Sequence, residues 1–540
     1  MPALEKNHIY RSTIEGYSSE GLGVARIDGQ VVFVHDAVRG EDCDILVMKV
    51  LKNVAFGKPV LRHSTSPHRQ EPDCPYYGRC GGCDFRHLDY AEELWAKRQR
   101  GQDALTRLGG SDVTVEEILG AAQPLRYRNK SQYPVSADGR VGFYRARSHQ
   151  VVEVEHCLLQ KPQADALAAA LRQYLAQYHV PGYDETTGRG LVRHLYVRSN
   201  CKGESLVCLL VNGESLPYET ELVALLRQAA PQTVGVVLGV NTRPGNAILG
   251  DRYRTLWGEG ALTDVLCGRT VRLSVPSFYQ VNHPQAEVLY GKALEFAGLT
   301  GTELAVDLYC GAGTITQVLA RQARHVIGGE IVPEAIRDAR ASARRNGVEN
   351  VEFLGGDAAD VAAELALRQL RPDVICVDPP RKGLAPEVIA SIAAMAPRRV
   401  VYVSCDPGTL GRDVKRFAEM GYLARRAVAV DLFPHTHHVE TVCLLSKLQS
   451  KEHIEIEVKM DELELTSAES KATYEEIREY VFEHTGLKVS HLYIAQVKQK
   501  YGIIERENYN KPKSENARQP QCPPEKEKAI TEALRHFGMI

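Results

Sequence analysis

The pattern of apolar and polar positions changes character along the chain and indicates several domains. Between Gly21 and Lys58, short apolar runs separated by glycine-containing turns predict the strands of a small β-barrel. Between Thr302 and Lys447, short apolar runs alternate with charged, amphipathic stretches, a rhythm that predicts parallel strands covered by helices. We therefore predict an α/β protein with a Rossmann-like domain in its C-terminal half.

The region between these two segments predicts a mixed α+β domain. Leu94, Leu105 and Leu108 lie among charged residues within 88–108, as in an amphipathic helix. Runs rich in β-branched and other apolar residues predict strands at 194–200, 204–212 and 233–241.

After residue 448 the pattern predicts a small helical extension. Thr473 and Glu476 form a capping box ahead of a helix that Gly486 closes. The other predicted elements are a strand at 454–460, a helix over Ser490–Tyr501, a polar linker from 508 to 524 and a final helix ending near Gly538.

Chain length and composition support this division. At 540 residues the chain is too long for one ordinary core, and 44% hydrophobic with 25% charged residues is typical of a globular protein. The net charge of -2 excludes neither nucleic acid nor small molecules as partners. The predicted domains are a β-barrel (1–60), a mixed central domain (61–275), a Rossmann-like domain (276–448) and a helical extension of unknown role (449–540).

No segment has the features of an export signal or a membrane span. The N-terminus lacks a basic region followed by an apolar stretch, and no apolar run is long enough to cross a bilayer. We therefore expect a cytoplasmic protein without membrane contact. Thirteen cysteines, an odd number, then argue against a disulfide framework and for metal binding or catalysis.

A glycine-rich turn is predicted where the first strand of the Rossmann-like domain ends. Asp307-Leu-Tyr-Cys-Gly311-Ala-Gly313 closes this strand and opens a helix, so backbone amides can approach a ligand closely. A dinucleotide fold would place a third glycine at Thr316, so NAD and FAD are disfavoured. The next strand ends in Glu330, which is well placed to accept hydrogen bonds from a ribose diol. The pattern predicts a nucleoside site without a pyrophosphate; the alternative is an ordinary tight turn.

Two further strands of the same sheet end in acidic or reactive side chains. Asp378-Pro-Pro follows one strand, and its paired prolines stiffen an acidic loop that fits a methyl donor and its target base. The alternative is a simple strand exit. Cys405 follows the next strand, before an Asp406-Pro-Gly turn that exposes it. Most cytosolic cysteines are buried and inert, but a cysteine at this ligand-binding edge is a candidate nucleophile.

A thiol at this edge suggests a specific chemistry. Carbon 5 of uracil is a poor nucleophile towards a sulfonium methyl group, but attack by a thiolate on carbon 6 creates an enolate whose carbon 5 accepts the methyl. The proton on carbon 5 must then leave. Glu440, at the start of the last predicted strand, is the candidate acceptor. The alternative is that Glu440 is only a polar residue at a strand entrance.

Several short motifs of this half of the chain form a specific combination. They are Phe278-Tyr-Gln280-Val-Asn282, Asp307-Leu-Tyr309-Cys-Gly311, Asp378-Pro-Pro-Arg-Lys-Gly383, Ser404-Cys405-Asp-Pro407 and His438-Val-Glu440-Thr. With these motifs the chain resembles the bacterial RNA uracil-5-methyltransferases, particularly the ribosomal RNA branch that carries an iron–sulfur cluster. The resemblance covers about residues 5 to 448.

The resemblance implies a role for the residues of the predicted edge. Cys405 is the implied nucleophile and Glu440 the implied proton acceptor. S-adenosylmethionine is the implied cofactor. Some family members have asparagine where this chain has Thr314, so no cofactor contact is carried over to that position. The implied cofactor contacts are Gln280, Tyr309, Glu330 and Asp378.

Three cysteines lie close together in a polar, glycine-rich loop. Cys74, Cys80 and Cys83 are too clustered in such a loop for core packing, which indicates a bound metal. Their spacing does not separate a zinc ion from an iron–sulfur cluster, because both accept four thiolates. The resemblance implies that Cys157 is the fourth ligand and that the group is a 4Fe-4S cluster.

The resemblance also implies surfaces that bind RNA. The barrel is similar to a TRAM domain, a small RNA-binding module of the OB-like kind; the alternative is a purely structural barrel. Two stretches, beginning at Leu125 and at Gly142, interleave basic and tyrosine residues, as expected where phosphates are neutralised and bases stack. The alternative for each is a solvated strand face.

We predict methylation of carbon 5 of a uridine in 23S ribosomal RNA, with transfer RNA as the alternative substrate. RNA is the predicted partner; no obligate protein partner is expected, and the chain is expected to be a monomer.

A rival is an RNA cytosine-5-methyltransferase, but those enzymes have threonine–cysteine and proline–cysteine motifs, and this chain has Ser404-Cys405 and Asp378-Pro-Pro. The other rival is a non-catalytic RNA-binding iron–sulfur protein, which intact Cys405 and Glu440 motifs disfavour. The extension could contact RNA or pack on its own domain.

Overall fold

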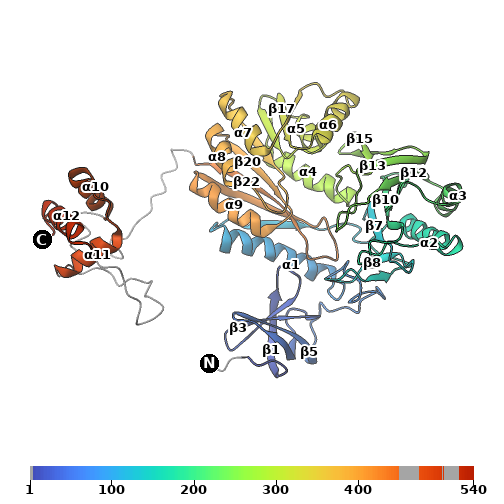
Figure 1. The fold of residues 1–540 in the computed structure, drawn as a ribbon, viewed down its shortest axis with the longest axis horizontal. Helices are drawn as coiled ribbons and strands as arrows, with labels where there is room; N and C mark the ends of the chain where they lie inside the picture. The colour runs from blue at the N-terminus through green and yellow to red at the C-terminus, as the bar shows by residue number, and fades with distance from the viewer. Residues whose placement is uncertain (1–3, 449–473, 502, 504–521) are drawn as a thin grey trace. The chain divides into compact units, whose positions relative to one another are not determined.

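The computed structural model describes residues 4–448, 474–501, 503 and 522–540 (Figure 1). The chain divides into two compact units, residues 1–449 and 450–540, and each is described by itself. Within the described ranges no helix is long and apolar enough to cross a membrane.

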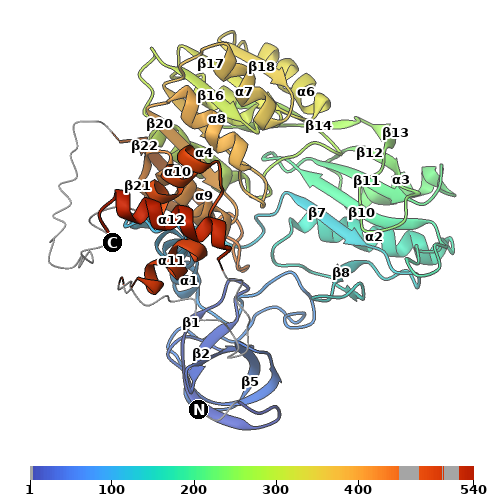
Figure 2. The same cartoon turned by 60° about the vertical axis from the view of Figure 1, so that its left-hand side comes forward.

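The N-terminal residues form a closed barrel, which appears as a ring in Figure 2. In order around the ring, the strands are β1 (Ile9–Tyr17), β2 (Gly23–Ile27), β3 (Gln30–Val34), β5 (Val54–Ser64) and β4 (Asp42–Val50). Alternate residues point inwards, so that Ile14, Val32 and Ile45 are fully or almost fully buried. The predicted barrel is confirmed; β1 lies before the predicted segment 21–58, and β5 extends beyond it.

A long helix, α1 (Tyr90–Asp103), follows the cysteine-containing loop and continues as a π-helical turn, Ala104–Leu108. Asp89 caps its start by accepting a hydrogen bond from the Glu92 amide at 2.8 Å. Tyr17 of the barrel donates to the Glu92 carboxylate at 2.9 Å. The predicted helix is confirmed, and it joins the barrel to the rest of the unit.

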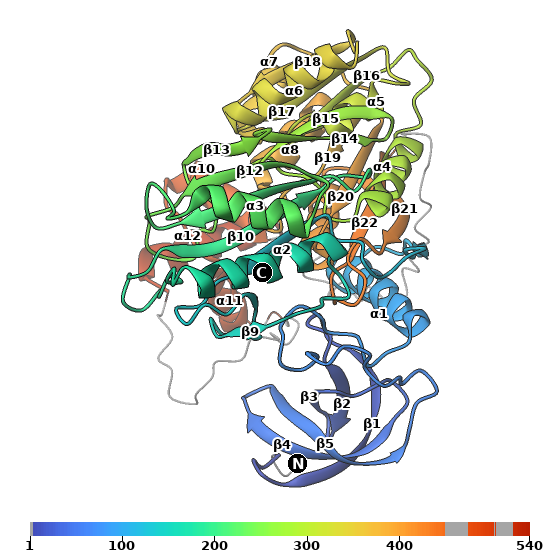
Figure 3. The ribbon, with the colours of Figure 1, turned by 90° about the vertical axis from the view of Figure 1, so that its right-hand side faces the viewer.

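The central region is built on a five-stranded sheet with two helices on one face (Figure 3). From edge to edge its strands are β13 (Arg252–Gly258), β12 (Thr233–Val240), β11 (Ser205–Val211), β10 (Val192–Ser199) and β7 (Lys130–Pro134). The helices are α2 (Pro162–Gln177) and α3 (Glu219–Ala229), and a hairpin of β8 (Gly142–Tyr144) and β9 (Val151–Glu153) precedes them. Leu167, Leu195 and Leu222 lie in their shared core. The three predicted strands are confirmed.

The rest of the first unit is an eight-stranded sheet covered by helices on both faces. Its strand order is β18 (Val351–Gly355), β17 (His325–Glu330), β16 (Leu304–Leu308), β19 (Val374–Val377), β20 (Arg399–Ser404), β22 (Glu440–Lys447), β21 (Tyr422–Val430) and β6 (Val115–Leu119). The helices are α4 (His283–Ala297), α5 (Thr314–Leu319), α6 (Pro333–Arg345), α7 (Ala358–Leu367), α8 (Pro386–Met395) and α9 (Pro407–Glu419), and β14 (Ala261–Leu266) and β15 (Arg269–Ser274) form a hairpin before α4.

Successive residues of the central strands enter opposite cores of this sheet. Ala305 packs in the core that contains residues of α4 and α5, whereas Val306 packs in the core that contains residues of α7, α8 and α9. A strand buried on both faces reads as a continuous apolar run, which is the pattern seen in the sequence. The predicted Rossmann-like α/β fold is confirmed.

The sheet differs from the prediction of parallel strands at one side. β22 pairs antiparallel with β20 and β21, because the segment 431–439 between β21 and β22 is a loop and not a helical crossover. β6 pairs in parallel with β21, although it lies within the segment predicted as the central domain. This short strand has no sequence pattern that links it to a partner so distant in the chain.

The second unit contains three short helices, α10 (Tyr474–Thr485), α11 (His491–Lys500) and α12 (Pro524–His536). Ser490 caps α11 by accepting a hydrogen bond from the Tyr493 amide at 3.4 Å. The three predicted helices are confirmed. Their buried core includes Ile477, Val481, Ile494, Ile530 and Leu534. The predicted strand at 454–460, the capping Thr473 and most of the linker at 508–524 lie outside the described residues.

A buried ion cluster fastens α1 to the large sheet. Lys97 Nζ lies 2.6 Å from Glu93 Oε1 and 2.6 Å from Asp431 Oδ1, and none of the three side chains is exposed. Lys97 also donates to the Phe433 carbonyl at 3.0 Å, and Tyr90 donates to Asp431 at 2.7 Å. Burial opposes the charge on Lys97, but the two carboxylates outweigh it and raise the pKa of the lysine.

Replacing Lys97 with methionine should lower the free energy of unfolding by about 3–5 kcal/mol, because Glu93 and Asp431 would lose their buried cation. The matched control is Lys292→Met, which removes a partly exposed lysine 3.0 Å from Glu295 and should cost at most about 1 kcal/mol. Urea unfolding followed by circular dichroism measures both. Equal effects of the two substitutions would contradict the anchoring role of Lys97.

Candidate active site

The turn between β16 and α5 has a backbone conformation that few side chains tolerate. Tyr309, Gly311 and Gly313 have φ angles of 67°, 54° and 77°. A Cβ atom on Gly313 would lie 2.8 Å from the Phe353 ring, so this position requires glycine. Glu330, at the end of β17, accepts a hydrogen bond from the Gly311 amide at 3.0 Å. The glycine turn and this carboxylate therefore lie side by side.

Three carboxyl groups with raised pKa values lie near the edge of the sheet. Burial raises the pKa of Asp307 and of Asp378 to about 7. Burial, and to a smaller extent the charge of Asp378, raise the pKa of Glu440 to about 8. The Thr316 hydroxyl donates to Asp307 at 2.6 Å, whereas Glu440 is 3% exposed at the start of β22. Carboxyl groups held in this way mark a candidate functional site.

Cys405 lies between the end of β20 and the start of α9. Asp406 caps this helix by accepting a hydrogen bond from the Thr409 amide at 3.0 Å, which fixes the turn that carries the thiol. Burial, followed by the charges of Glu440 and Asp378, raises the pKa of Cys405 to about 11. Asp378 follows β19, Cys405 follows β20 and Glu440 begins β22, so neighbouring strands place the three groups at one edge of the sheet.

Arg381, to which the sequence assigned no role, lies near this thiol and contacts His438. Arg381 opposes the raised pKa values of both Cys405 and Glu440. Its Nη2 atom lies 3.3 Å from the ring of His438. Burial, followed by neighbouring positive charge, lowers the pKa of His438 to about 3, so this imidazole is neutral. The sequence did contain a signal for Arg381, because it directly follows Asp378-Pro-Pro.

Gln280 reaches the same edge from the segment before α4. Its side chain lies close to the buried Tyr290. The charges of Asp378 and Glu440 add to burial in raising the pKa of this phenol. The Gln280 carbonyl accepts a hydrogen bond from Asn129 Nδ2 at 2.9 Å. Asn129 therefore positions this segment, a role that its local sequence did not indicate.

Residues of the stretch that begins at Leu125 alternate between buried and partly exposed, and the prediction that its tyrosines stack on RNA bases is wrong for Tyr127. Tyr127 is 4% exposed and donates to a backbone carbonyl at 3.2 Å. Arg126 donates to Asp165 at 2.9 Å. Sequence alternation could not show that these polar groups have distant partners. The more exposed stretch that begins at Gly142 stays a prediction.

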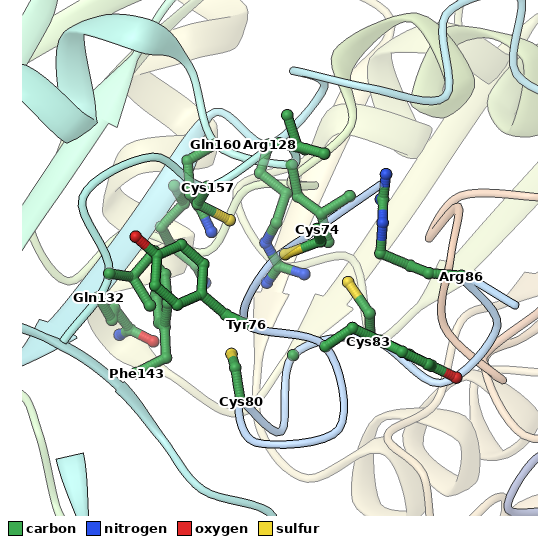
Figure 4. Close-up of a pocket in the computed structure, with 16 residues that line it drawn as sticks. Cys74, Tyr76, Cys80, Cys83, Arg86, Arg128, Gln132, Phe143, Cys157 and Gln160 are labelled. Carbon is green, nitrogen blue, oxygen red and sulfur yellow. The ribbon is translucent and has the colours of Figure 1, made fainter. Parts of the chain in front are cut away.

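The four cysteines singled out in the sequence line a cavity of ≈ 200 Å³ (Figure 4). Cys74, Cys80 and Cys83 come from the loop before α1, and Cys157 comes from the segment after β9. Figure 4 shows their sulfur atoms facing a common space. Burial raises the pKa of Cys80 to about 11, and the other thiols add to this effect.

Three cationic side chains, Arg86, Arg128 and Lys130, line the same cavity. Arg86 pairs with Asp73 but keeps a buried Nη1 atom without a hydrogen-bond partner. Burial, followed by the charges of two arginines, lowers the pKa of Lys130 to about 8. Concentrated positive charge beside four thiols fits an anionic group held by thiolates.

The spacing of the sulfur atoms bears on the size of that group. Four sulfur ligands around one zinc ion, each at about 2.3 Å, lie about 3.8 Å from one another. In the part of the chain that the structure describes, one group of three or more His, Cys, Asp or Glu ligand atoms lies mutually within 4.8 Å, and it contains Cys201, Asp264 and His283. The four cysteines of the cavity are therefore spread more widely than a single zinc ion requires.

Comparisons with known proteins agree with this geometry. Residues 269–448 match the model of the tRNA (uracil-5-)-methyltransferase family, and residues 4–60 match that of the TRAM domain. An uncharacterized RNA methyltransferase of Clostridium tetani is 40% identical over 82% of this chain and 97% of its own length, and one of Halalkalibacterium halodurans is 42% identical over 82% and 98%. A similar solved structure is that of the Pyrococcus abyssi tRNA (uracil-54, C5)-methyltransferase in complex with S-adenosyl-L-homocysteine. It aligns with a TM-score of 0.65 and 25% sequence identity, and the alignment covers 81% of this chain and 100% of the Pyrococcus abyssi chain.

Replacing Glu440 with glutamine should change how stability depends on pH. The folded-state pKa of Glu440, about 8, lies above the ordinary value of 4.5, so the wild type loses stability as pH rises from 5 to 9 and the buried carboxyl ionises. The variant has no such loss and should gain roughly 2–4 kcal/mol relative to wild type across this range. Urea unfolding at pH 5, 7 and 9 measures the difference. Glu387→Gln, at an exposed position, should track the wild type; a Glu440→Gln curve that also does so would contradict the prediction.

Proposed function

The chain belongs to the RNA uracil-5-methyltransferase family, and on that premise we propose that it forms 5-methyluridine in 23S ribosomal RNA with S-adenosylmethionine as methyl donor. The observation that carries this proposal is the convergence of the Cys405 thiol with the desolvated carboxyls of Asp378 and Glu440 at one sheet edge. A nucleophilic thiol beside a base is the pair that methylation of uracil carbon 5 requires.

The residues around the glycine turn fit a nucleoside methyl donor. S-adenosylmethionine supplies an electrophilic methyl group on a positively charged sulfur. Glu330, whose carboxylate is held by the Gly311 amide, would accept hydrogen bonds from the ribose hydroxyls. Asp378 would offset the positive charge on the sulfur, and Tyr309 and Gln280 would supply further contacts. The Pyrococcus abyssi enzyme, a complex with S-adenosyl-L-homocysteine, supports this choice of cofactor.

The proposed reaction begins at carbon 6 of the uracil. The Cys405 thiolate forms a bond to carbon 6, and the displaced electron pair makes carbon 5 nucleophilic. Carbon 5 takes the methyl group from the sulfonium, whose sulfur keeps the bonding electrons. Glu440 then removes the proton from carbon 5, the double bond between carbons 5 and 6 forms again, and the thiolate leaves.

The electrostatics of the site suggest how Cys405 becomes a thiolate. In the protein alone the pKa of Cys405 is about 11, because burial and the carboxylates of Glu440 and Asp378 oppose ionisation. A positively charged donor beside Asp378 offsets the carboxylate charge that raises the pKa of both Cys405 and Glu440. Binding of the donor and the charge of Arg381 therefore act together to activate the nucleophile and the base.

We propose that the cysteine cavity holds a 4Fe-4S cluster. Cys74, Cys80, Cys83 and Cys157 supply four thiolate ligands, and their spacing suits a group larger than one zinc ion. A thiolate-ligated cluster carries net negative charge, which would stabilise the buried cations of the cavity. We expect the cluster to tie the loop of residues 65–89 to the central domain and to shape the RNA surface, with no electron transfer in the reaction.

Two observations keep transfer RNA as a second candidate substrate. The matching family model and the Pyrococcus abyssi enzyme are both described as acting on tRNA uracil. The proposed cluster favours ribosomal RNA through the resemblance stated above. In either RNA the target base must leave its stack to reach Cys405, so a loop or unpaired segment is the expected site.

We propose that residues 1–60 act as the barrel domain, residues 61–275 as the central domain and residues 276–448 as the methyl-transfer domain.

The direct test is nucleoside mass spectrometry of unmodified 23S ribosomal RNA and transfer RNA after incubation with the protein and labelled S-adenosylmethionine. We expect 5-methyluridine in the ribosomal RNA, none with Cys405→Ala, and a rate lowered by about 10²–10⁴-fold with Glu440→Gln. The Glu440→Gln variant should also accumulate a protein–RNA adduct that survives denaturation, because the carbon 5 proton stays in place. Methylation only in transfer RNA would select the second candidate, and an unmethylated RNA pool would contradict both.

Substituting Cys80 with serine should remove most of the iron and sulfide, because one of four ligands is lost. Iron and acid-labile sulfide per chain, with the visible absorption of the purified protein, measure this. Cys267→Ser, a cysteine outside the cavity, is the matched control and should keep both. Zinc in place of iron in the wild type, or iron unchanged in Cys80→Ser, would contradict the cluster assignment.

A further inference from the structure

A second group of metal-binding residue types lies away from both sites described above. Cys201 is in the turn between β10 and β11, Asp264 lies in β14, and His283 is the first residue of α4. A ligand atom from each of these three side chains lies within 4.8 Å of the other two. We propose that Cys201, Asp264 and His283 form a zinc site that fastens two turns of the central region to the start of α4.

The hydrogen bonding of His283 prepares it for such a role. Its Nε2 atom lies 2.6 Å from the carbonyl oxygen of Val265. Because a carbonyl only accepts, Nε2 donates a proton to it, which leaves Nδ1 as the ring nitrogen whose lone pair can bind an ion. Metal-binding histidines commonly have this arrangement, in which one ring nitrogen donates to a carbonyl and the other binds the ion.

Asp264 is held in place by three hydrogen bonds. Its Oδ1 accepts from the amides of Cys201 at 3.0 Å and Val265 at 2.9 Å, and its Oδ2 accepts from the Tyr279 hydroxyl at 2.9 Å. Only 2% of the residue is exposed. These bonds fix the carboxylate, and one lone pair of Oδ2 remains for a metal ion. The backbone bond to Cys201 also keeps that turn against β14.

The set of donors selects the ion. One thiolate, one imidazole and one carboxylate are ligands that zinc accepts, whereas calcium and magnesium prefer oxygen alone. The thiolate and the carboxylate together balance the charge of a divalent ion. Three protein ligands leave one tetrahedral position for water, which the exposed side of Cys201 allows. Ligand atoms around one zinc ion lie about 3.3–3.8 Å apart. The three atoms already lie within 4.8 Å of one another, so a small movement of the exposed thiol would bring them to that spacing.

The position of the site gives it a mechanical consequence. Tyr279, which donates to Asp264, directly precedes Gln280, and His283 follows Asn282, the residue that caps α4. Zinc would therefore clamp the segment 279–283 from both of its ends. This inference concerns metal binding alone and does not depend on the proposed methylation.

The test compares zinc binding by the iron-loaded wild type, Cys201→Ser and His283→Ala. After chelation, dialysis against zinc and gel filtration, we expect one more zinc per wild-type chain than in either variant, and an affinity at least about 10-fold weaker in both variants. Cobalt in place of zinc should give a thiolate-to-cobalt charge-transfer band that Cys201→Ser lacks. Elemental analysis and difference absorption spectra measure these quantities.

Cys267→Ser is the matched control, because Cys267 lies on the hairpin that carries Asp264 and is outside the ligand group. It should bind zinc as the wild type does, and iron should be equal in all four proteins. Zinc retained by both Cys201→Ser and His283→Ala, or no zinc bound by the wild type, would overturn the proposal. So would a loss of iron in step with zinc, because the zinc would then occupy the cysteine cavity.

Discussion

The buried ammonium group of Lys97 is the charge on which the arrangement of the active-site edge depends. It is shared by Glu93, one turn away on α1, and by Asp431, 334 positions further along the chain. Glu93 also accepts a hydrogen bond from the His435 amide at 2.6 Å. Two points of the loop that leads into Glu440 are thereby fixed to α1. Separating a buried cation from its carboxylate partners leaves uncompensated buried charges, so moving the loop away from α1 has a large energetic cost.

The active-site edge shows the opposite electrostatic condition. Asp378 and Glu440 have pKa values raised by burial, and their charges oppose ionisation of Cys405. Lys97 places a buried cation within 2.6 Å of each of two carboxylates, whereas at this edge the acidic groups lack sufficient cations in the protein alone. Such an arrangement lowers stability and is retained where a ligand supplies the missing charge. A cationic methyl donor has that property, and a neutral nucleoside does not.

The parts of the structure that the sequence predicted are those set by local pattern. Strand ends place Glu330, Asp378 and Cys405 at one edge because parallel strands share their direction, and this follows from apolar runs alone. The pairing of β6 with β21 and the hydrogen bond from Asn129 to Gln280 could not be predicted, because they join segments far apart in the sequence. Local pattern also misassigned Tyr127, since a tyrosine has the same sequence signature whether its hydroxyl meets solvent or a buried carbonyl.

Side-chain cross-links are most needed where regular secondary structure ends. The loop of residues 65–89 and the segment 275–282 both lack helices and strands, so backbone ladders cannot hold them. The second segment is held by Asn282, whose side chain donates to the Leu432 carbonyl at 3.1 Å, and by the bond from Asn129 to the Gln280 carbonyl. Each of these bonds contributes only about 1 kcal/mol, whereas metal ligands impose both distance and direction. The two proposed ligand sets beside these irregular segments are therefore where added rigidity would have the greatest effect on the proposed RNA and cofactor surfaces.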